Sequence, residues 1–233
     1  MPKATKSAAK KTVTSATEAA PKKAVKTPVK KAAKKAVKKA VKKPATGDAR
    51  AEIISSQVVY EGPMFRVLRD QIVEPGGVSA SRDLIRHNGS VVILAIDQGK
   101  KKSDPWIVVE HQYRHAANQY LWELPAGKLE PGEDPLEGAK RELEEETGYK
   151  ARKWKLLVEY WPSPGFLGEQ MKIFLAEGLI AGEARPEEDE RIDFRLVKFS
   201  EALKMLDKGL ISDGKTLAGL LTFARKLAKK PKK

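Results

Sequence analysis

The segment from Gly127 to Tyr149, GKLEPGEDPLEGAKRELEEETGY, constrains the fold of this chain most strongly, because it contains both the start and the stop signals of a helix. Asp134 is a favourable N-cap residue and Pro135 suits the first helical position. Gly148 suits the left-handed conformation in which many helices end. Apolar residues between these signals recur at helical spacing. The sequence therefore predicts a helix that begins at Pro135 and ends just before Gly148.

The second half of this predicted helix carries four acids within five positions, Glu142, Glu144, Glu145 and Glu146. Acids stabilise the start of a helix rather than its end, because the helix dipole is negative at the carboxyl end. Like charges three or four residues apart also repel, at a cost of roughly 0.2–0.5 kcal/mol per pair. A solvated acidic face is the ordinary interpretation of an acidic run, but a bound divalent cation would remove both conflicts. We interpret the run as a metal site.

The charge of the 233-residue chain, formally +14, is distributed unevenly. Residues 1–46 contain 15 lysines and one acid, and residues 225–233 contain six basic residues. The remaining residues, 47–224, carry a net charge of −6. The Lys/Ala-rich first segment lacks large apolar side chains, so we expect a disordered tail. We therefore divide the chain into a disordered tail (1–46), a folded domain (47–224) and a basic C-terminal tail (225–233).

The lysine-rich tail has two interpretations that the sequence leaves open. It can bind nucleic acid non-specifically through counterion release, or it is a solubilising extension without a specific partner. The chain has no cysteine, which excludes disulfides and cysteine-bound zinc. It also has no apolar run long enough to span a membrane. We expect a cytoplasmic protein without membrane contact, in association with nucleic acid if the tail binds it.

The folded domain is predicted to be a mixed α/β structure in which strands outnumber helices. Runs rich in β-branched and aromatic residues alternate with Gly- and Pro-containing turns. The run SVVILAID is continuously apolar, which is typical of a strand buried on both faces. The predicted strands occupy 52–62, 65–77, 81–89, 90–97, 104–114, 154–161, 170–178 and 192–200, and further helices lie near 200–208 and 213–228.

The acidic segment resembles the Nudix box at each of its defined positions. Gly127, Glu133, the triplet Arg141–Leu143, the pair Glu145–Glu146 and the pair Gly148–Tyr149 have the spacing of that motif. The resemblance implies an α/β/α sandwich, here with a β-rich segment at its N-terminal side. It also implies a hydrolase that cleaves a nucleoside diphosphate linked to another group, with Mg²⁺ or Mn²⁺ as cofactor.

The flanking segments are similar to those of the ADP-ribose pyrophosphatase branch of this family. The similarity covers VVEHQYRHAANQYLWELPAG before the box and PSPGFLGEQMKIFLAEGL after it, and Pro164 lies fifteen residues beyond Tyr149. It implies hydrolysis of ADP-ribose, or a related nucleoside diphosphate sugar, to AMP and ribose 5-phosphate. It also implies a homodimer in which N-terminal strands of one chain complete the other's site. Another nucleoside diphosphate derivative stays open as substrate.

The resemblance assigns roles to the residues of the box. Glu142 and Glu146 are expected to bind the metal together with the backbone carbonyl of Ala126, and Glu145 is a further ligand with a part in catalysis. Arg141 is expected to orient the carboxylates by charge-assisted hydrogen bonds. Glu133 is expected to support these residues without binding the metal itself.

Residues outside the box complete the predicted site. In the acidic loop RPEEDERI, Glu188 is assigned as the general base and Glu190 as a metal ligand, although Glu187 and Asp189 are close enough in sequence to exchange roles with them. Arg114 is expected to bind the substrate's phosphates. Arg82 and Phe65 are expected to contact the ribose or adenine across the dimer.

Two other functions compete with this assignment. The segment GLISDGKT, from Gly209 to Thr216, has the letters of a P-loop. A P-loop follows a buried strand, however, and the preceding residues are predicted to form a short amphipathic helix. Asp213 is better interpreted as the N-cap of the last helix. The second alternative is a nucleic-acid-binding protein that acts through its lysine-rich tail.

Overall fold

The computed structural model describes residues 50–62, 65–97, 103–185 and 191–229. Its centre is strand β4 (Ser90–Asp97), in which every residue from Ser90 to Ile96 is buried. This confirms the prediction that the apolar run SVVILAID is covered on both faces.

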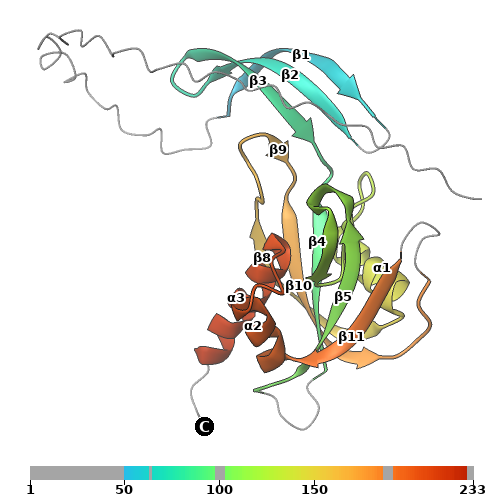
Figure 1. Cartoon of the computed structure of the whole chain (residues 1–233). Helices are drawn as coiled ribbons and strands as arrows, with labels where there is room; N and C mark the ends of the chain where they lie inside the picture. The colour runs from blue at the N-terminus through green and yellow to red at the C-terminus, as the bar shows by residue number, and fades with distance from the viewer. Residues whose placement is uncertain (1–49, 63–64, 98–102, 186–190, 230–233) are drawn as a thin grey trace, which may run out of the picture. The chain divides into compact units, whose positions relative to one another are not determined.

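Strand β4 is the central strand of a mixed sheet (Figure 1). Its strands follow the order β11 (Ile192–Lys198), β5 (Trp106–Arg114), β4, β10 (Met171–Ile180) and β8 (Lys150–Tyr160). Strand β10 runs parallel to β4, and the other neighbours along this path are antiparallel. Two shorter strands attach to it: β6 (Gln119–Glu123) pairs with β5, and β7 (Ala126–Lys128) pairs with β4.

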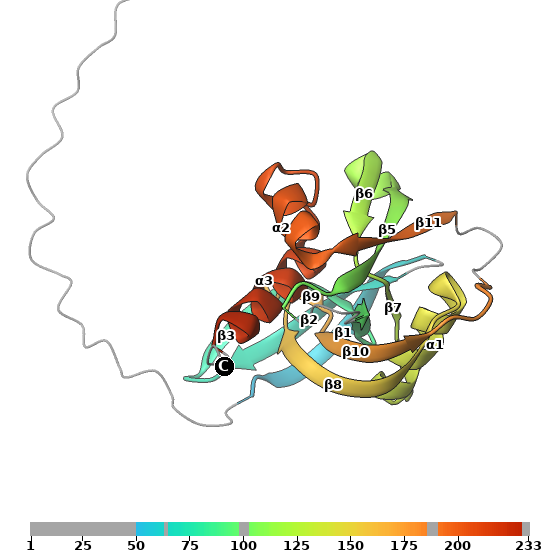
Figure 2. The ribbon, with the colours of Figure 1, turned by 90° about the horizontal axis from the view of Figure 1, so that it is seen from below.

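Helices cover both faces of this sheet, so the described chain is an α/β/α sandwich, as predicted. Side chains of β4 alternate between the two layers. Ile93 and its odd-numbered neighbours pack towards helix α1 (Pro135–Thr147). Leu94 and its even-numbered neighbours pack towards the side that carries α2 (Phe199–Asp207) and α3 (Gly214–Ala228). Figure 2 shows α1 on one side of the central strands and α2 and α3 on the other.

A second sheet is formed by the N-terminal strands β1 (Glu52–Glu61), β2 (Arg66–Glu74) and β3 (Val78–Arg86). They form an antiparallel meander, and β3 continues into a short parallel pair with β9 (Leu167–Gly168). All ten residues of β1 are exposed. The large exposed apolar side chains of this sheet and its loops are Ile53, Ile54, Val58, Val59, Tyr60, Phe65 and Val78.

The predicted and observed elements differ in two places: around the segment that precedes α1, and around β8, which begins at Lys150 rather than at residue 154 and is followed by β9 in a stretch predicted to contain no strand. The sequence analysis predicted no strand between β5 and α1, whereas the structure contains β6 and β7 there. These strands are short and contain few β-branched residues, so their pairing with β5 and β4 rather than their own composition defines them. No described helix is long and apolar enough to cross a membrane.

Candidate active site

Helix α1 begins and ends at the residues that its sequence signals indicate. The Asp134 side chain accepts hydrogen bonds from two backbone amides of the first turn, at 2.9 and 3.2 Å. At the other end, Gly148 has a φ of 69° and its amide donates to the Glu144 carbonyl at 2.8 Å. Because Ala139 and Leu143 are fully buried against the sheet, the rotation of α1 is fixed as well. The caps and the apolar face together determine where the acids of α1 lie.

Arg141 holds the acids of α1 from one side. Its Nη1 lies 2.9 Å from both Glu142 Oε1 and Glu145 Oε2. Its Nε donates to Glu133 Oε1 at 3.0 Å, and its Nη2 donates to Glu133 Oε2 at 3.1 Å and to the Lys128 carbonyl at 3.2 Å. The hydrogen bonds between Arg141 and Glu133 lower the pKa of Glu133. The same bonds raise the pKa of Arg141, although burial acts in the opposite direction. One guanidinium therefore contacts three carboxylates and offsets part of their charge.

Strand β7 brings a loop backbone into close contact with these acids. A Cβ atom added to Gly127 would lie 1.9 Å from the Cδ atom of Glu142, so a side chain at this position would collide with that carboxylate. The Ala126 amide donates to Glu146 Oε2 at 3.1 Å. Gly127 and Ala126 are held in place because they pair with Val91 and Val92 of β4. The central sheet thus positions the backbone that faces the acidic side of α1.

The donors at this junction fit a hard divalent cation. Carboxylates and backbone carbonyls are the ligands that Mg²⁺ and Mn²⁺ prefer, and Glu142, Glu145, Glu146 and Ala126 supply only oxygens of this kind. Within the described residues, no three His, Cys, Asp or Glu side chains already surround a common point that could hold a metal ion. Arg141 and the Ala126 amide instead occupy some of these oxygens. The residues present therefore suit the metal chemically, with Arg141 compensating two of the carboxylates.

Glu110 of β5 is a further member of this site that the sequence analysis missed. Its side chain is almost fully buried, and this burial raises its pKa to about 8, against the opposing effect of a hydrogen bond with Glu146. Its Oε1 atom has no hydrogen-bond partner in the described part of the chain. Burial therefore favours the neutral form of Glu110 beside Glu146. The sequence feature that could have identified Glu110 is its position as an acid within the apolar run WIVVEHQYR.

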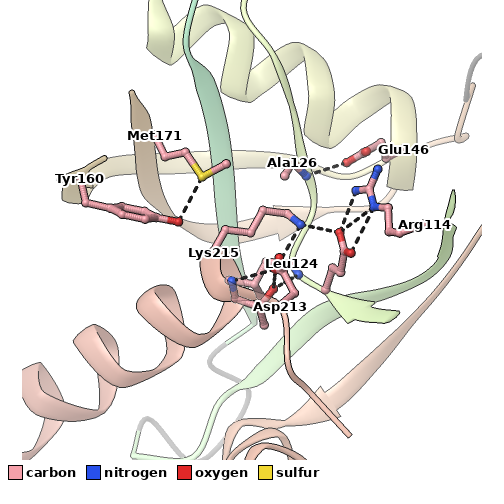
Figure 3. Close-up of polar contacts among 10 residues, drawn as sticks. Arg114, Leu124, Ala126, Glu146, Tyr160, Met171, Asp213 and Lys215 are labelled. Atoms are coloured by element: carbon pink, nitrogen blue, oxygen red, sulfur yellow. Dashed lines mark hydrogen bonds and ion pairs between the residues drawn. The ribbon is translucent and has the colours of Figure 1, made fainter. Parts of the chain in front are cut away.

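Arg114, at the end of β5, is held by Glu123 of β6 (Figure 3). Its Nη2 donates to Glu123 Oε2 at 2.7 Å, and its Nε lies 3.1 and 3.2 Å from the two carboxylate oxygens. Burial opposes the charge on Arg114, but Glu123, and then Glu146 and Asp213, outweigh it and raise the pKa of Arg114. Arg114 and the acids of α1 therefore belong to one electrostatic site.

The other predicted site residues lie elsewhere in the chain or outside its described part. Arg82 is on β3, where it forms an ion pair with Glu74, and Phe65 packs against Tyr60 at a centroid distance of 5.7 Å. The structure thus groups Arg82 and Phe65 with the N-terminal strands rather than with α1.

Glu188 and Glu190, and with them Glu187 and Asp189, lie outside the described residues. On one side of this segment the Arg185 amide donates to the Glu145 carbonyl at 2.8 Å. On the other side Ile192 pairs with Gln112 of β5. The residues just before this segment therefore lie beside α1, and those just after it lie beside β5.

Comparison with known proteins identifies the family. A NUDIX domain model matches residues 86–220, which is more than half of the chain. The chain belongs to the Nudix family. This Nudix protein is 37% identical to the methanol dehydrogenase activator of Bacillus methanolicus, over 70% of this chain and 87% of that protein. It is 36% identical to an ADP-ribose pyrophosphatase of Bacillus subtilis, over 70% of this chain and 86% of that one.

A solved structure supports the fold. The crystal structure of an ADP compounds hydrolase superimposes on the Nudix protein with a TM-score of 0.65, covering 77% of this chain and 95% of that one at 18% sequence identity. The family and its sequence relatives identify the protein as a pyrophosphohydrolase. The acids of α1 lie within the matched residues.

We predict that Gly127→Ala lowers the free energy of unfolding by roughly 0.5–1 kcal/mol, because the added methyl group moves the flexible end of Glu142 away from its ion pair with Arg141. Urea denaturation measures this change. Gly165→Ala is the matched control, since nothing lies within 4 Å of a Cβ atom there, and neither glycine has a positive φ. Equal stability of the two variants would contradict the close approach of β7 to α1.

Proposed function

We propose that this Nudix protein hydrolyses the pyrophosphate bond of ADP-ribose, or of a related nucleoside diphosphate sugar, in a reaction that requires Mg²⁺ or Mn²⁺. From ADP-ribose, the products are AMP and ribose 5-phosphate. The observation that carries the proposal is the arrangement of Arg141 with Glu142 and Glu145 on α1, opposite the side-chain-free backbone of Gly127. The similarity to an ADP-ribose pyrophosphatase supports the choice of substrate.

The site supplies oxygen donors for a cation and a positive group for the substrate. Glu142, Glu145 and Glu146 with the Ala126 carbonyl would hold the cation, and Glu190 is proposed to join them. When bound, such a cation neutralises phosphate oxygens and lowers the pKa of a water molecule. Arg114 binds the diphosphate by charge-assisted hydrogen bonds from the part of its guanidinium that Glu123 leaves open.

The chemical step adds water across the pyrophosphate. A bond forms between the water oxygen and one phosphorus, and the bond from that phosphorus to the bridging oxygen breaks. Glu188 is proposed to accept the proton that the water loses. Arg141 keeps Glu142 and Glu145 in position, so that the carboxylates do not rearrange when the substrate enters.

We predict that the protein with Mg²⁺ releases AMP and ribose 5-phosphate from ADP-ribose faster than it hydrolyses any nucleoside triphosphate. Chromatography of the products of a panel that includes ADP-ribose, GDP-mannose and 8-oxo-dGTP measures this preference. Faster turnover of GDP-mannose would favour the alternative that another nucleoside diphosphate derivative is the substrate. Faster turnover of 8-oxo-dGTP would contradict the proposed substrate class.

The same assay tests the acids of α1 through a matched pair of variants. Glu146→Gln retains the side-chain shape but removes a metal-binding charge, so we expect turnover to fall by roughly 10²-fold or more. Glu144→Gln changes a neighbouring acid that is paired with Lys150 at 2.9 Å, and turnover should stay close to that of the wild type. Near-wild-type turnover of Glu146→Gln at saturating Mg²⁺ would show that the metal site is wrongly assigned.

The N-terminal strands support the proposal of a homodimer. Exposed apolar residues gather on a thin sheet, among them Ile54 at 61%, Tyr60 at 52% and Val78 at 59% exposure. A two-sided exposed sheet with such side chains is typical of a surface that a partner covers. We propose that a second copy of the chain covers it, and that Arg82 and Phe65 contact the ribose or adenine in that copy's site.

We expect multi-angle light scattering to give twice the chain mass of 25.8 kDa at the concentrations used for the enzyme assay. Ile54→Lys places a charge in the exposed apolar surface and should shift the protein towards monomer. Lys155→Ala, on β8 of the other sheet, is the control and should remain dimeric. A monomeric wild type would contradict the dimer, although not the hydrolase.

Residues 1–46 are proposed to form a disordered tail that contacts nucleic acid without sequence preference, separately from catalysis by the domain that follows. This segment contains 15 lysines but no aromatic residue on which a base could stack. Full-length protein should be retained on DNA at low salt and released steeply as salt rises. A protein starting at Gly47 should not be retained, yet should keep its turnover. A tenfold loss of turnover on truncation would contradict this separation.

A further inference from the structure

Lys215, in the first turn of α3, is a buried cation that the proposed reaction does not use. Its side chain is 10% exposed, and its Nζ contacts Glu123 Oε2 and lies 3.1 Å from Asp213 Oδ2. Glu123 is itself 3% exposed at the side chain and is the carboxylate that holds Arg114. Two cations from distant parts of the sequence therefore share one buried acid (Figure 3).

The elements around Lys215 fix it in this position. Asp213 caps α3 by accepting hydrogen bonds from the Thr216 amide at 3.0 Å and the Thr216 hydroxyl at 2.8 Å. The Thr216 hydroxyl in turn accepts a hydrogen bond from the Leu124 amide at 2.8 Å. Leu124 follows Glu123 directly, so α3 is tied to the end of β6 at two adjacent points.

These contacts explain the P-loop letters of GLISDGKT. Helix α2, rather than a buried strand, precedes Gly209, as the sequence analysis predicted, and this context is not that of a P-loop. The Lys and Thr of the segment point to β6 and not to a nucleotide loop of their own. The segment connects the last helix to the residue that positions Arg114.

Arg114 is the outermost member of this group. Its side chain is 40% exposed, in contrast to Glu123 and Lys215. Its Nε and Nη2 are directed to Glu123, and Nη1 has no hydrogen-bond partner among the described residues. Glu123 and Lys215 form a buried pair of opposite charges. Because Asp213 also lies against Lys215, two cations balance two acids in this group, and Arg114 is the cation with a free edge towards the site.

We propose that Lys215 is a positioning residue for substrate binding, which acts through Glu123 to keep Arg114 oriented and positively charged towards the diphosphate. This inference rests on the proposed function, in which Arg114 binds the phosphates. Without Lys215, the charges of Glu123 and Asp213 act on Arg114 alone, and the group carries a net negative charge. The attraction between Arg114 and an anionic substrate then weakens in the ground state and the transition state alike. Such a change raises KM and leaves kcat largely unchanged.

The test compares steady-state kinetics of the full-length protein with those of matched variants. Lys215→Met should raise KM for ADP-ribose about tenfold, with kcat within about threefold of the wild type. Lys215→Arg retains the charge and should restore most of the affinity. Lys226→Met is the control, because it removes a lysine from the other end of α3, where Nζ donates to the Leu157 carbonyl at 3.1 Å. Its KM should match the wild type, and equal KM values for both methionine variants would overturn the proposal.

A second variant separates the effect of charge from a loss of structure. Glu123→Gln combined with Lys215→Met removes the buried pair together and leaves Arg114 with a neutral acceptor. Because the charge of Glu123 is gone, KM of this double variant should lie below that of Lys215→Met. A purely structural role of Lys215 predicts no such recovery. A KM equal to or above that of the single variant would overturn the proposal. If the single variant fails to fold, a double variant whose KM is about tenfold above that of the wild type would overturn it instead.

Titration calorimetry with ADP as ligand keeps this inference distinct from the proposed reaction. Lys215→Met should bind ADP about tenfold more weakly than the wild type and than Lys226→Met, whether or not ADP-ribose is hydrolysed. If Lys215→Met binds ADP more weakly but the wild type does not hydrolyse ADP-ribose, only the proposed function is contradicted. Hydrolysis with unchanged ADP affinity would contradict the role of Lys215 alone.

Discussion

The contacts of Arg141 are the interaction on which the site depends. Four acids in the second half of α1 repel one another and oppose the helix dipole, and a fold that buries one face of this helix brings them closer to low-dielectric surroundings. Arg141 reduces this repulsion through ion pairs with Glu133, Glu142 and Glu145, and it also donates a hydrogen bond to the Lys128 carbonyl. Glu133, Glu142 and Glu145 are thereby held in fixed positions around one guanidinium before any cation binds. Removal of Arg141 would leave three carboxylates without their shared partner, which is more costly than the loss of a surface ion pair.

The rest of the domain places partners around that arrangement. Strand β4 packs α1 on one face and α2 and α3 on the other, and it also pairs with β7, whose Gly127 leaves room for Glu142. Strand β5 contributes Glu110 and Arg114 from the adjacent position of the sheet. Acidic groups that would bind a cation and a basic group that would bind phosphates therefore meet at one edge of the central strands. This juxtaposition is the physical basis for a pyrophosphate as substrate.

The sequence predicted those features that depend on neighbouring residues. The ends of α1 follow from Asp134 and Gly148, and the burial of β4 follows from an uninterrupted apolar run. Features that depend on distant contacts were missed. Strand β7 exists because it pairs with β4, and Lys215 contacts an acid that lies 92 residues before it. Glu110 carries a raised pKa because the fold buries it beside Glu146, which no local pattern shows.

The central claim is that the acids of α1 form one cation site whose members are set by the rotation of the helix. Calorimetric titration of Mn²⁺ into the protein, in the absence of substrate, tests this claim most directly. The account predicts that Glu142→Gln weakens Mn²⁺ binding at least tenfold, because it removes a donor that faces Gly127. Glu144→Gln, on a residue paired with Lys150 instead, should bind Mn²⁺ as the wild type does. Equal weakening by both variants would show that the acidic run attracts cations only through its total charge.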